Sequence, residues 1–141
     1  MKIRIARIEK DLPLPEYQTE GAVAFDMYSR VDAVLAPKEL KILPSNFIIE
    51  VPKGYCLLLA PRSSTPKKKG LVLRSSNLID QDYHGPNDEI GLAFYNFTEK
   101  PVEVKRGERI AQGFLVPILR AEWEETEQIK DSSRGGFGST G

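Results

Sequence analysis

The sequence has 141 residues, of which 20 are basic and 20 acidic, and its formal net charge is +0. This balance excludes the overall basic excess of a typical nucleic-acid-binding protein, and 40% apolar residues are ordinary for a globular domain. No apolar run approaches the roughly 20 residues that cross a bilayer, and the first residues lack the pattern of a signal peptide. We therefore expect a soluble, intracellular protein without membrane contact or direct nucleic-acid binding.

Short apolar segments alternate with turn residues along the chain. Ile3 and Ile5 alternate with charged residues, as in a half-buried strand. Further apolar segments lie at 47–51, 55–59, 71–73, 90–97, 102–104 and 110–118. Cys56, the single cysteine, lies inside one of them, which predicts a buried thiol. One helical turn is expected, with Thr65 as N-cap and Gly70 just past its end. Many short strands with frequent turns indicate an all-β sandwich or barrel.

The first candidate functional residue in chain order is Asp26, a lone acid in the otherwise apolar segment 21–29. A buried carboxylate needs a partner, because an unpaired charge is costly to remove from water. Arg62 is the obvious candidate for that partner.

Residues 60–66 follow a predicted strand and carry Arg62, Ser63 and Ser64. An arginine can bind a phosphate with two hydrogen bonds, and serine hydroxyls can donate more. Three lysines at 67–69 raise the local positive potential. A phosphate-binding turn and a solvated basic turn both fit this segment taken alone.

Segment 77–85 combines acids with an aromatic residue. If it is extended, Asp80 and Asp82 share one face and Tyr83 lies on the other. One carboxylate could act as a general base toward water, and the tyrosine ring could pack on a sugar or base. Two solvated turn aspartates are the alternative. His84 has no cysteine or second histidine near it in the sequence, so an exposed turn residue is expected rather than a metal ligand.

The last two segments are a turn that leads into a strand carrying Gln112, and the glycine- and serine-rich residues 131–141. Taken alone, Gln112 is a surface residue of a hairpin. The tail suits a lid over a phosphorylated aromatic ligand, because glycines allow close backbone approach, Arg134 supplies charge and Phe137 can stack. A disordered tail is the alternative. We expect a β domain at 1–130 and a mobile tail at 131–141.

Five stretches, AVAFDMYS, APRSST, NLIDQDYHG, RGERIAQ and RGGFGSTG, resemble in this order the five motifs of the trimeric dUTP pyrophosphatase (dUTPase) family. The resemblance runs from about residue 20 to the last residue. It implies a jelly-roll-like β protomer that forms a homotrimer with three active sites. Each site would take residues from more than one subunit, and the tail of one chain would close over the site of a neighbour.

The resemblance also implies roles for individual residues. Asp80 resembles the base that directs water at the α-phosphorus of dUTP, and Mg²⁺ would be held mainly through the substrate phosphates and waters. Tyr83 resembles the residue that packs on deoxyribose, and Asp26 a supporting residue. The remaining substrate-binding positions are Arg62, Ser63, Ser64 and Gln112 for phosphates, Asn77, Leu78 and Ile79 for uracil, and Arg134, Phe137, Gly138, Ser139 and Thr140 in the tail. The products would be dUMP and pyrophosphate.

The chain departs from the family pattern at a few positions. Asn77 stands where the family usually has glycine, and His84 where it usually has arginine or glutamine. Arg134 lies three residues before Phe137, where a common family form has its arginine five residues before.

Two other functions share this scaffold. A dCTP deaminase carries a glutamate three residues before the asparagine that ends a strand, and here Ala93 lies three residues before Asn96. A nucleotide-dependent regulatory protein without catalysis would be expected to have lost a residue such as Asp80 or Arg62, and both are present. A purely structural trimer leaves the polar motif residues unexplained.

Overall fold

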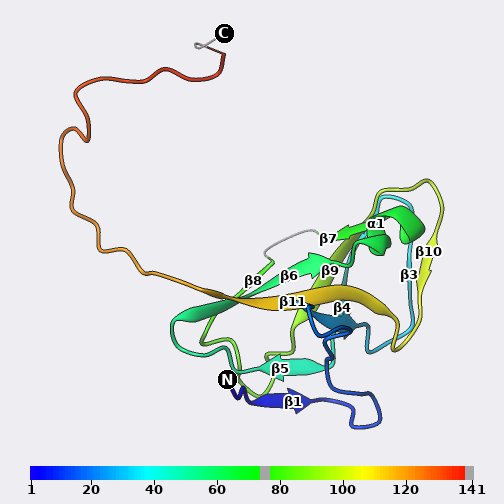
Figure 1. Ribbon diagram of the computed structural model, residues 1–141. Helices are drawn as coiled ribbons and strands as arrows, with labels where there is room; N and C mark the ends of the chain where they lie inside the picture. Colours follow the sequence, from blue (N-terminus) through cyan, green and yellow to red (C-terminus); the bar gives the residue numbers. More distant parts are fainter. Residues whose placement is uncertain (74–76, 139–141) are drawn as a thin grey trace.

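The computed structural model of the chain describes residues 1–73 and 77–138 (Figure 1). Within these ranges it is built almost entirely of short strands, with one short helix. The elements are β1 (Ile5–Arg7), β2 (Phe25–Tyr28), β3 (Ala33–Leu35), β4 (Leu40–Pro44), β5 (Phe47–Ile49), β6 (Tyr55–Pro61), α1 (Ser64–Lys69), β7 (Leu71–Leu73), β8 (Leu78–Ile79), β9 (Gly91–Asn96), β10 (Val102–Val104) and β11 (Arg109–Pro117). The predicted all-β class is confirmed.

The strands pair antiparallel in a jelly-roll-like arrangement. The largest sheet has the order β2-β11-β6-β8, a second has the order β4-β9-β7, and β1-β5 and β3-β10 form two-stranded ribbons. Sequence neighbours therefore separate in space, and strands distant in sequence pair. The two longest strands, β6 and β11, pair from Ala111↔Pro61 to Pro117↔Tyr55 and cross the middle of the molecule (Figure 1).

The core lies between the sheets. Leu92 and Phe94, two residues apart on β9, are fully buried. Leu57 of β6 and Met27 of β2, which belong to the other sheet, are fully buried in the same apolar cluster. Each such side chain contributes roughly 1.5–3 kcal/mol when it is removed from water. Cys56 is also buried, as predicted.

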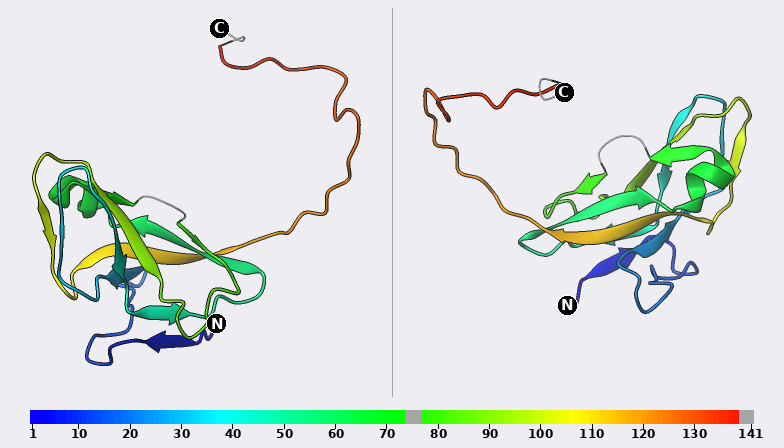
Figure 2. Two further views of the ribbon diagram at one scale, coloured as in Figure 1. Left: turned by 180° about the vertical axis from the view of Figure 1, so that it is seen from behind. Right: turned by 45° about the horizontal axis from the view of Figure 1, so that its top comes forward.

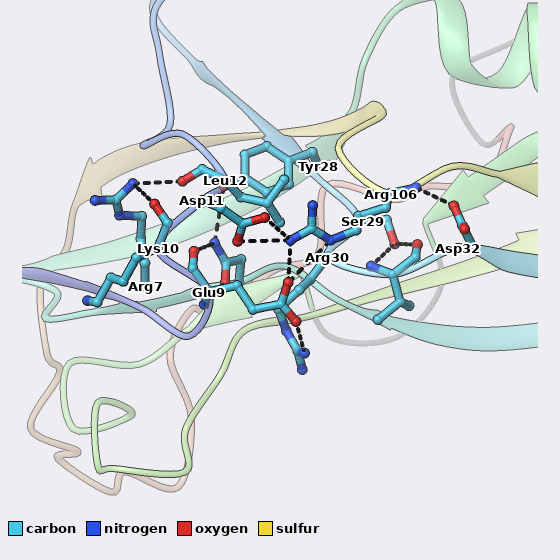
Figure 3. A network of polar contacts seen from close by, with 12 residues as sticks. Arg7, Glu9, Lys10, Asp11, Leu12, Tyr28, Ser29, Arg30, Asp32 and Arg106 are labelled. Atoms are coloured by element: carbon cyan, nitrogen blue, oxygen red, sulfur yellow. Dashed lines mark hydrogen bonds and ion pairs between the residues drawn. The ribbon is translucent and has the colours of Figure 1, made fainter.

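A network of charged residues fastens the N-terminal segment to this body (Figure 3). Arg30 lies 2.8 Å from a carboxylate oxygen of Glu89 and 3.2 Å from Glu9. Arg106, from the turn between β10 and β11, pairs with the same Glu9 and lies 2.9 Å from Asp11. The segment that follows β1 is thereby held beside the turn that precedes β11.

The helix differs from its predicted start. It begins at Ser64, with Ser63 in the N-cap position and without a side-chain cap, so the assignment of Thr65 as N-cap was wrong. Thr65 is buried, and its hydroxyl instead donates to the backbone oxygen of Ile110, 2.9 Å away. The predicted end is confirmed, because Gly70 follows the last turn in the left-handed conformation with φ 69°.

Beyond β11 the chain leaves the body. Residues 118–138 run away from the sheets as an extended arm, visible in all three views (Figures 1 and 2). The apolar side chains of Leu119, Trp123 and Ile129 are almost completely exposed on it. Among the described residues, no helix is long and apolar enough to cross a bilayer.

Candidate active site

The polar site begins with the buried carboxylate of Asp26 in β2. Its side chain is 9% exposed, and the Nε of Arg62 lies 2.9 Å from its Oδ1. The predicted Asp26–Arg62 pair is therefore confirmed. A second arginine, Arg109 at the start of β11, places its Nη1 3.3 Å from Oδ2 of the same carboxylate. The sequence reasoning did not predict this contact.

Strand register explains why these residues meet. Gln112 of β11 pairs with Asp26 on one side and with Ala60 on the other, so all three side chains point to the same face. Arg62 lies two residues after Ala60 and returns to that face. Gln112 is half-buried and its Nε2 donates to the backbone oxygen of Pro61, 3.2 Å away. Gln112 is thus part of the polar cluster.

The cluster borders a cationic hollow. A cavity of about 300 Å³ lies next to α1, and its lining includes Arg62, Ser64, Lys68, Lys69 and Arg109. Glu108 also lines it and pairs with Lys69 at 2.6 Å. A hollow with this excess of basic groups and a serine hydroxyl favours an anion such as a phosphate. Ser63 is exposed at the start of α1.

A β-bulge in β11 supports this cluster. Arg109 pairs with Tyr28 and Ala111 pairs with Met27, so Ile110 is one residue in excess. The backbone oxygen of Ile110 accepts hydrogen bonds from the Thr65 hydroxyl at 2.9 Å and the Arg62 backbone nitrogen at 3.4 Å. The bulge therefore anchors the segment that carries Arg62 and the two serines.

The second group of predicted site residues lies around Asp80, where the chain turns. Asp80 is exposed, and its backbone oxygen accepts a hydrogen bond from the nitrogen of Tyr83 at 3.4 Å. The segment is not extended here, because this turn interrupts the alternation, and Asp80 and Asp82 are both exposed, as in the alternative of two solvated turn aspartates. Asp80 lines a separate cavity of about 510 Å³. Its other lining residues are Gln81 and Asp82, Tyr55 and Cys56 of β6, and Ile118 and Arg120 after β11.

The residues before this turn are held against β6. Asn77 accepts a hydrogen bond through its backbone oxygen from Leu59, at 2.7 Å, and β8 pairs Leu78 with Leu58 and Ile79 with Leu57. Tyr83 is 40% exposed, and its hydroxyl donates to the backbone oxygen of Glu89 at 3.2 Å.

One chain does not bring the two groups together. Ile79 lies beside Leu57 of β6, and Arg62 lies five residues further along the chain, directly after the end of β6. At about 3.3 Å per residue, roughly 17 Å separates those backbone positions. The cavity beside Arg62 and the cavity beside Asp80 share no lining residue. Within one chain, the two groups of predicted site residues therefore line two separate cavities.

The tail residues lie apart from both groups. Arg134, Phe137 and Gly138 are exposed near the end of the arm. Ser139 and Thr140 lie outside the described residues. In residues 1–73 and 77–138, no group of three or more histidine, cysteine, aspartate and glutamate side chains is close enough to hold a metal ion.

The fold and the cluster define a class: a jelly-roll-like β protein with a cationic, serine-bearing cavity whose charge suits a phosphorylated ligand. The chain belongs to the dUTPase family, whose model matches residues 10–141. It is 44% identical to the deoxyuridine 5'-triphosphate nucleotidohydrolase of Dictyoglomus turgidum, over 100% of this chain and 99% of the relative. The enzyme of the same name from Nautilia profundicola is 38% identical over 100% and 99% of the two chains.

Solved structures of dUTPases have the same fold as this chain. The dUTPase of Staphylococcus bacteriophage 80alpha with dUPNHPP has a TM-score of 0.88 and 26% identity, over 99% of this chain and 98% of that one. A mutant dUTPase from phage phi11 of S. aureus has a TM-score of 0.82 and 21% identity, over 91% and 98%, and its structure is described as showing the coordination of a structural Mg(II) ion.

Proposed function

We propose that this chain hydrolyses dUTP to dUMP and pyrophosphate, which keeps uracil out of DNA and supplies dUMP for dTMP synthesis. The observation that carries the proposal is the buried Asp26 that orients Arg62 beside Gln112 at a cationic cavity, in a chain that belongs to the dUTPase family.

The polar cluster binds the phosphates. Arg62 uses its Nε toward Asp26, and a guanidinium has further donors on its two terminal nitrogens that suit phosphate oxygens. The hydroxyls of Ser63 and Ser64 and the amide of Gln112 add neutral donors. Such donors stabilise the charge that develops in the transition state, since they are held in place before the substrate arrives.

Asp80 acts as the general base. A water molecule attacks the α-phosphorus while its proton passes to the Asp80 carboxylate. The bond between the α-phosphorus and the bridging oxygen breaks, and its electron pair leaves with pyrophosphate. Mg²⁺ bound to the triphosphate would neutralise charge on that leaving group. It would enter with the substrate and keep several of its waters.

The nucleoside is held by the second group and the arm. The half-exposed ring of Tyr83 packs on deoxyribose, and backbone groups of Asn77, Leu78 and Ile79 read the uracil edge. Residues 131–141 close over the site, with Phe137 on uracil and Arg134, Gly138, Ser139 and Thr140 toward the phosphates.

The active form is a homotrimer in which Asp80 and Arg62 of one site come from different chains. The support is the distance of roughly 17 Å along β6 and an arm that ends far from its own body (Figure 2). An outer cavity of about 290 Å³ lined by apolar side chains, among them Ile3, Ile5 and Leu115, adds surface suited to contact between chains.

The direct test is pyrophosphate release from the purified protein with magnesium, with dUTP, dCTP, dTTP and UTP compared side by side. We expect release from dUTP alone. Asp80→Asn should bind dUTP but turn it over more slowly by orders of magnitude, and unchanged turnover would remove Asp80 from this role. A folded protein that binds dUTP and releases nothing would contradict hydrolysis and favour a regulatory function.

Subunit mixing tests the shared site. Asp80→Asn and Arg62→Met should each be nearly inactive alone. After the two proteins are unfolded and refolded together in equal amounts, about a quarter of the sites would carry both intact residues if these come from different chains. Activity should then reappear. If it does not reappear in mixed trimers, both residues act within one chain or do not act together.

A further inference from the structure

The register of β11 decides which side chain faces Asp26. From Ala111 onward, β11 pairs with β2 so that Gln112 lies opposite Asp26. Without the bulge, the same register would place Ile110 opposite Tyr28, on the face that Asp26 occupies. The extra residue turns Ile110 into the core, where it is 1% exposed, and puts Arg109 opposite Tyr28 instead. The bulge thereby exchanges an apolar side chain for a cation on the polar face.

The carboxylate of Asp26 needs this cation. Its Oδ1 contacts Arg62, whereas its Oδ2 is buried and accepts no hydrogen bond in the described part of the chain. Arg109 Nη1 lies 3.3 Å from that oxygen. The same Nη1 also donates to the side-chain oxygen of Gln18 in the loop before β2, which holds the guanidinium over Asp26.

We propose that Arg109 is a positioning residue for phosphate binding: it fixes the orientation of Asp26, and Asp26 in turn holds Arg62 toward the substrate. This inference rests on the proposed binding of dUTP. Without Arg109, one oxygen of a buried carboxylate has no counter-charge, and Asp26 is drawn to rotate toward Arg62. The guanidinium of Arg62 then loses its fixed direction, and the cationic cavity that Arg109 also lines loses one basic group.

The test compares two ligands, α,β-imido-dUTP with three phosphates and deoxyuridine with none. Arg109→Met should weaken the binding of the imido analogue about tenfold or more, in the range expected for a charged hydrogen bond, and leave deoxyuridine binding unchanged. In steady-state kinetics the same variant should raise KM for dUTP. Arg109→Lys should restore part of the loss, because a lysine reaches one oxygen but lacks the planar fork.

Arg106→Met is the matched control. Arg106 lies in the preceding turn, has similar exposure and also ties the N-terminal segment down, but it pairs with Glu9 and Asp11 rather than Asp26. The Arg106→Met variant should have a lower Tm but should not bind the imido analogue more weakly relative to deoxyuridine. The proposal would be overturned if Arg109→Met weakened the binding of both ligands equally. It would also be overturned if Arg106→Met weakened the binding of the imido analogue and left deoxyuridine binding unchanged.

A double-mutant cycle separates positioning from direct contact. If Arg109 acts through Asp26, then Arg109→Met in an Asp26→Asn background should cause little further loss of imido-dUTP affinity. Full additivity of the two losses would overturn the positioning role. The unmodified protein is measured first. If it does not bind the imido analogue, the proposed function itself is overturned, and this outcome is distinct from a failure of the Arg109 proposal.

Discussion

Gly70 is the position where the structure predicts the sharpest effect of a single methyl group. It caps α1 in the left-handed conformation, with φ 69°, and its backbone oxygen accepts a hydrogen bond from Phe97 at 3.1 Å. A Cβ at this position would lie 2.1 Å from Cγ2 of Thr98, whereas carbon atoms in contact lie about 3.5–4.0 Å apart. Gly70→Ala should therefore destabilise the fold by two separate mechanisms.

The magnitude follows from the two terms. A non-glycine residue in the left-handed region costs about 1–2 kcal/mol, and overpacking a close contact adds about 1–3 kcal/mol. Neither side can easily move, because the Thr98 hydroxyl lies 2.7 Å from Asn96 Oδ1 and 2.9 Å from the backbone oxygen of Lys100. The sum is about 2–5 kcal/mol, or a Tm decrease of very roughly 6–15 °C for a chain of this size.

Gly54→Ala is the control. Gly54 also has a positive φ, 85°, but a Cβ there meets no atom within 4 Å, so only the backbone term of about 1–2 kcal/mol applies. Tm values should be measured at one protein concentration, since association shifts them. Thr98→Ser removes the clashing methyl group and keeps the hydroxyl, so it should recover the steric part in Gly70→Ala. Equal Tm decreases at both glycines, or no recovery with Thr98→Ser, would refute the steric argument.

Further predictions concern the tail, sugar selectivity and acid stability. Truncation before Ser133 should abolish most dUTP turnover and leave the association state unchanged, as measured by pyrophosphate release and light scattering. Tyr83→Ala should let UTP compete better for dUTP hydrolysis, as measured by the inhibition constant of UTP. Arg106, and after it Arg30, lower the pKa of Glu9. The ionised form of Glu9 therefore stabilises the fold. This contribution to stability is complete above the pKa of Glu9 in the unfolded chain, about 4.5, and is lost as the pH falls from there through the lower pKa of the folded protein. Arg106→Met should flatten the decrease of Tm over that acid range.

The sequence predicted much of the fold because the strands bury alternate residues. The segments 71–73 and 102–104 became β7 and β10 with the same bounds, and segment 110–118 differs from β11 by one residue at each end. The Asp26–Arg62 pair was predictable as well, since a lone acid in an apolar strand must find a cation. These inferences depend on local pattern and on the cost of burying charge.

The bulge and its consequences were not predictable in this way. A bulge is a mismatch between β11 and β2, strands about 80 residues apart in sequence, so no local propensity encodes it. The only local sign is that Ile110 and Ala111 are adjacent apolar residues that break the alternation, and both are buried. Arg109 and Thr65 could be placed only once this register was known. The sequence left open whether Asp80 lies in a strand or a turn, because the turn is closed by a backbone hydrogen bond from Tyr83 rather than by a glycine or proline.

Stability alone does not explain the Asp26 cluster. Taking a carboxylate out of water costs several kcal/mol, and replacing a buried ion pair with well-packed apolar residues is often neutral or stabilising by about 1–4 kcal/mol. An apolar residue at position 26 would therefore serve the core as well as Asp26 or better. What the carboxylate contributes, and an apolar side chain cannot, is a fixed direction for Arg62 at the edge of the cationic cavity. This is why we propose that the buried acid, the bulge and the second arginine together support a phosphate ligand.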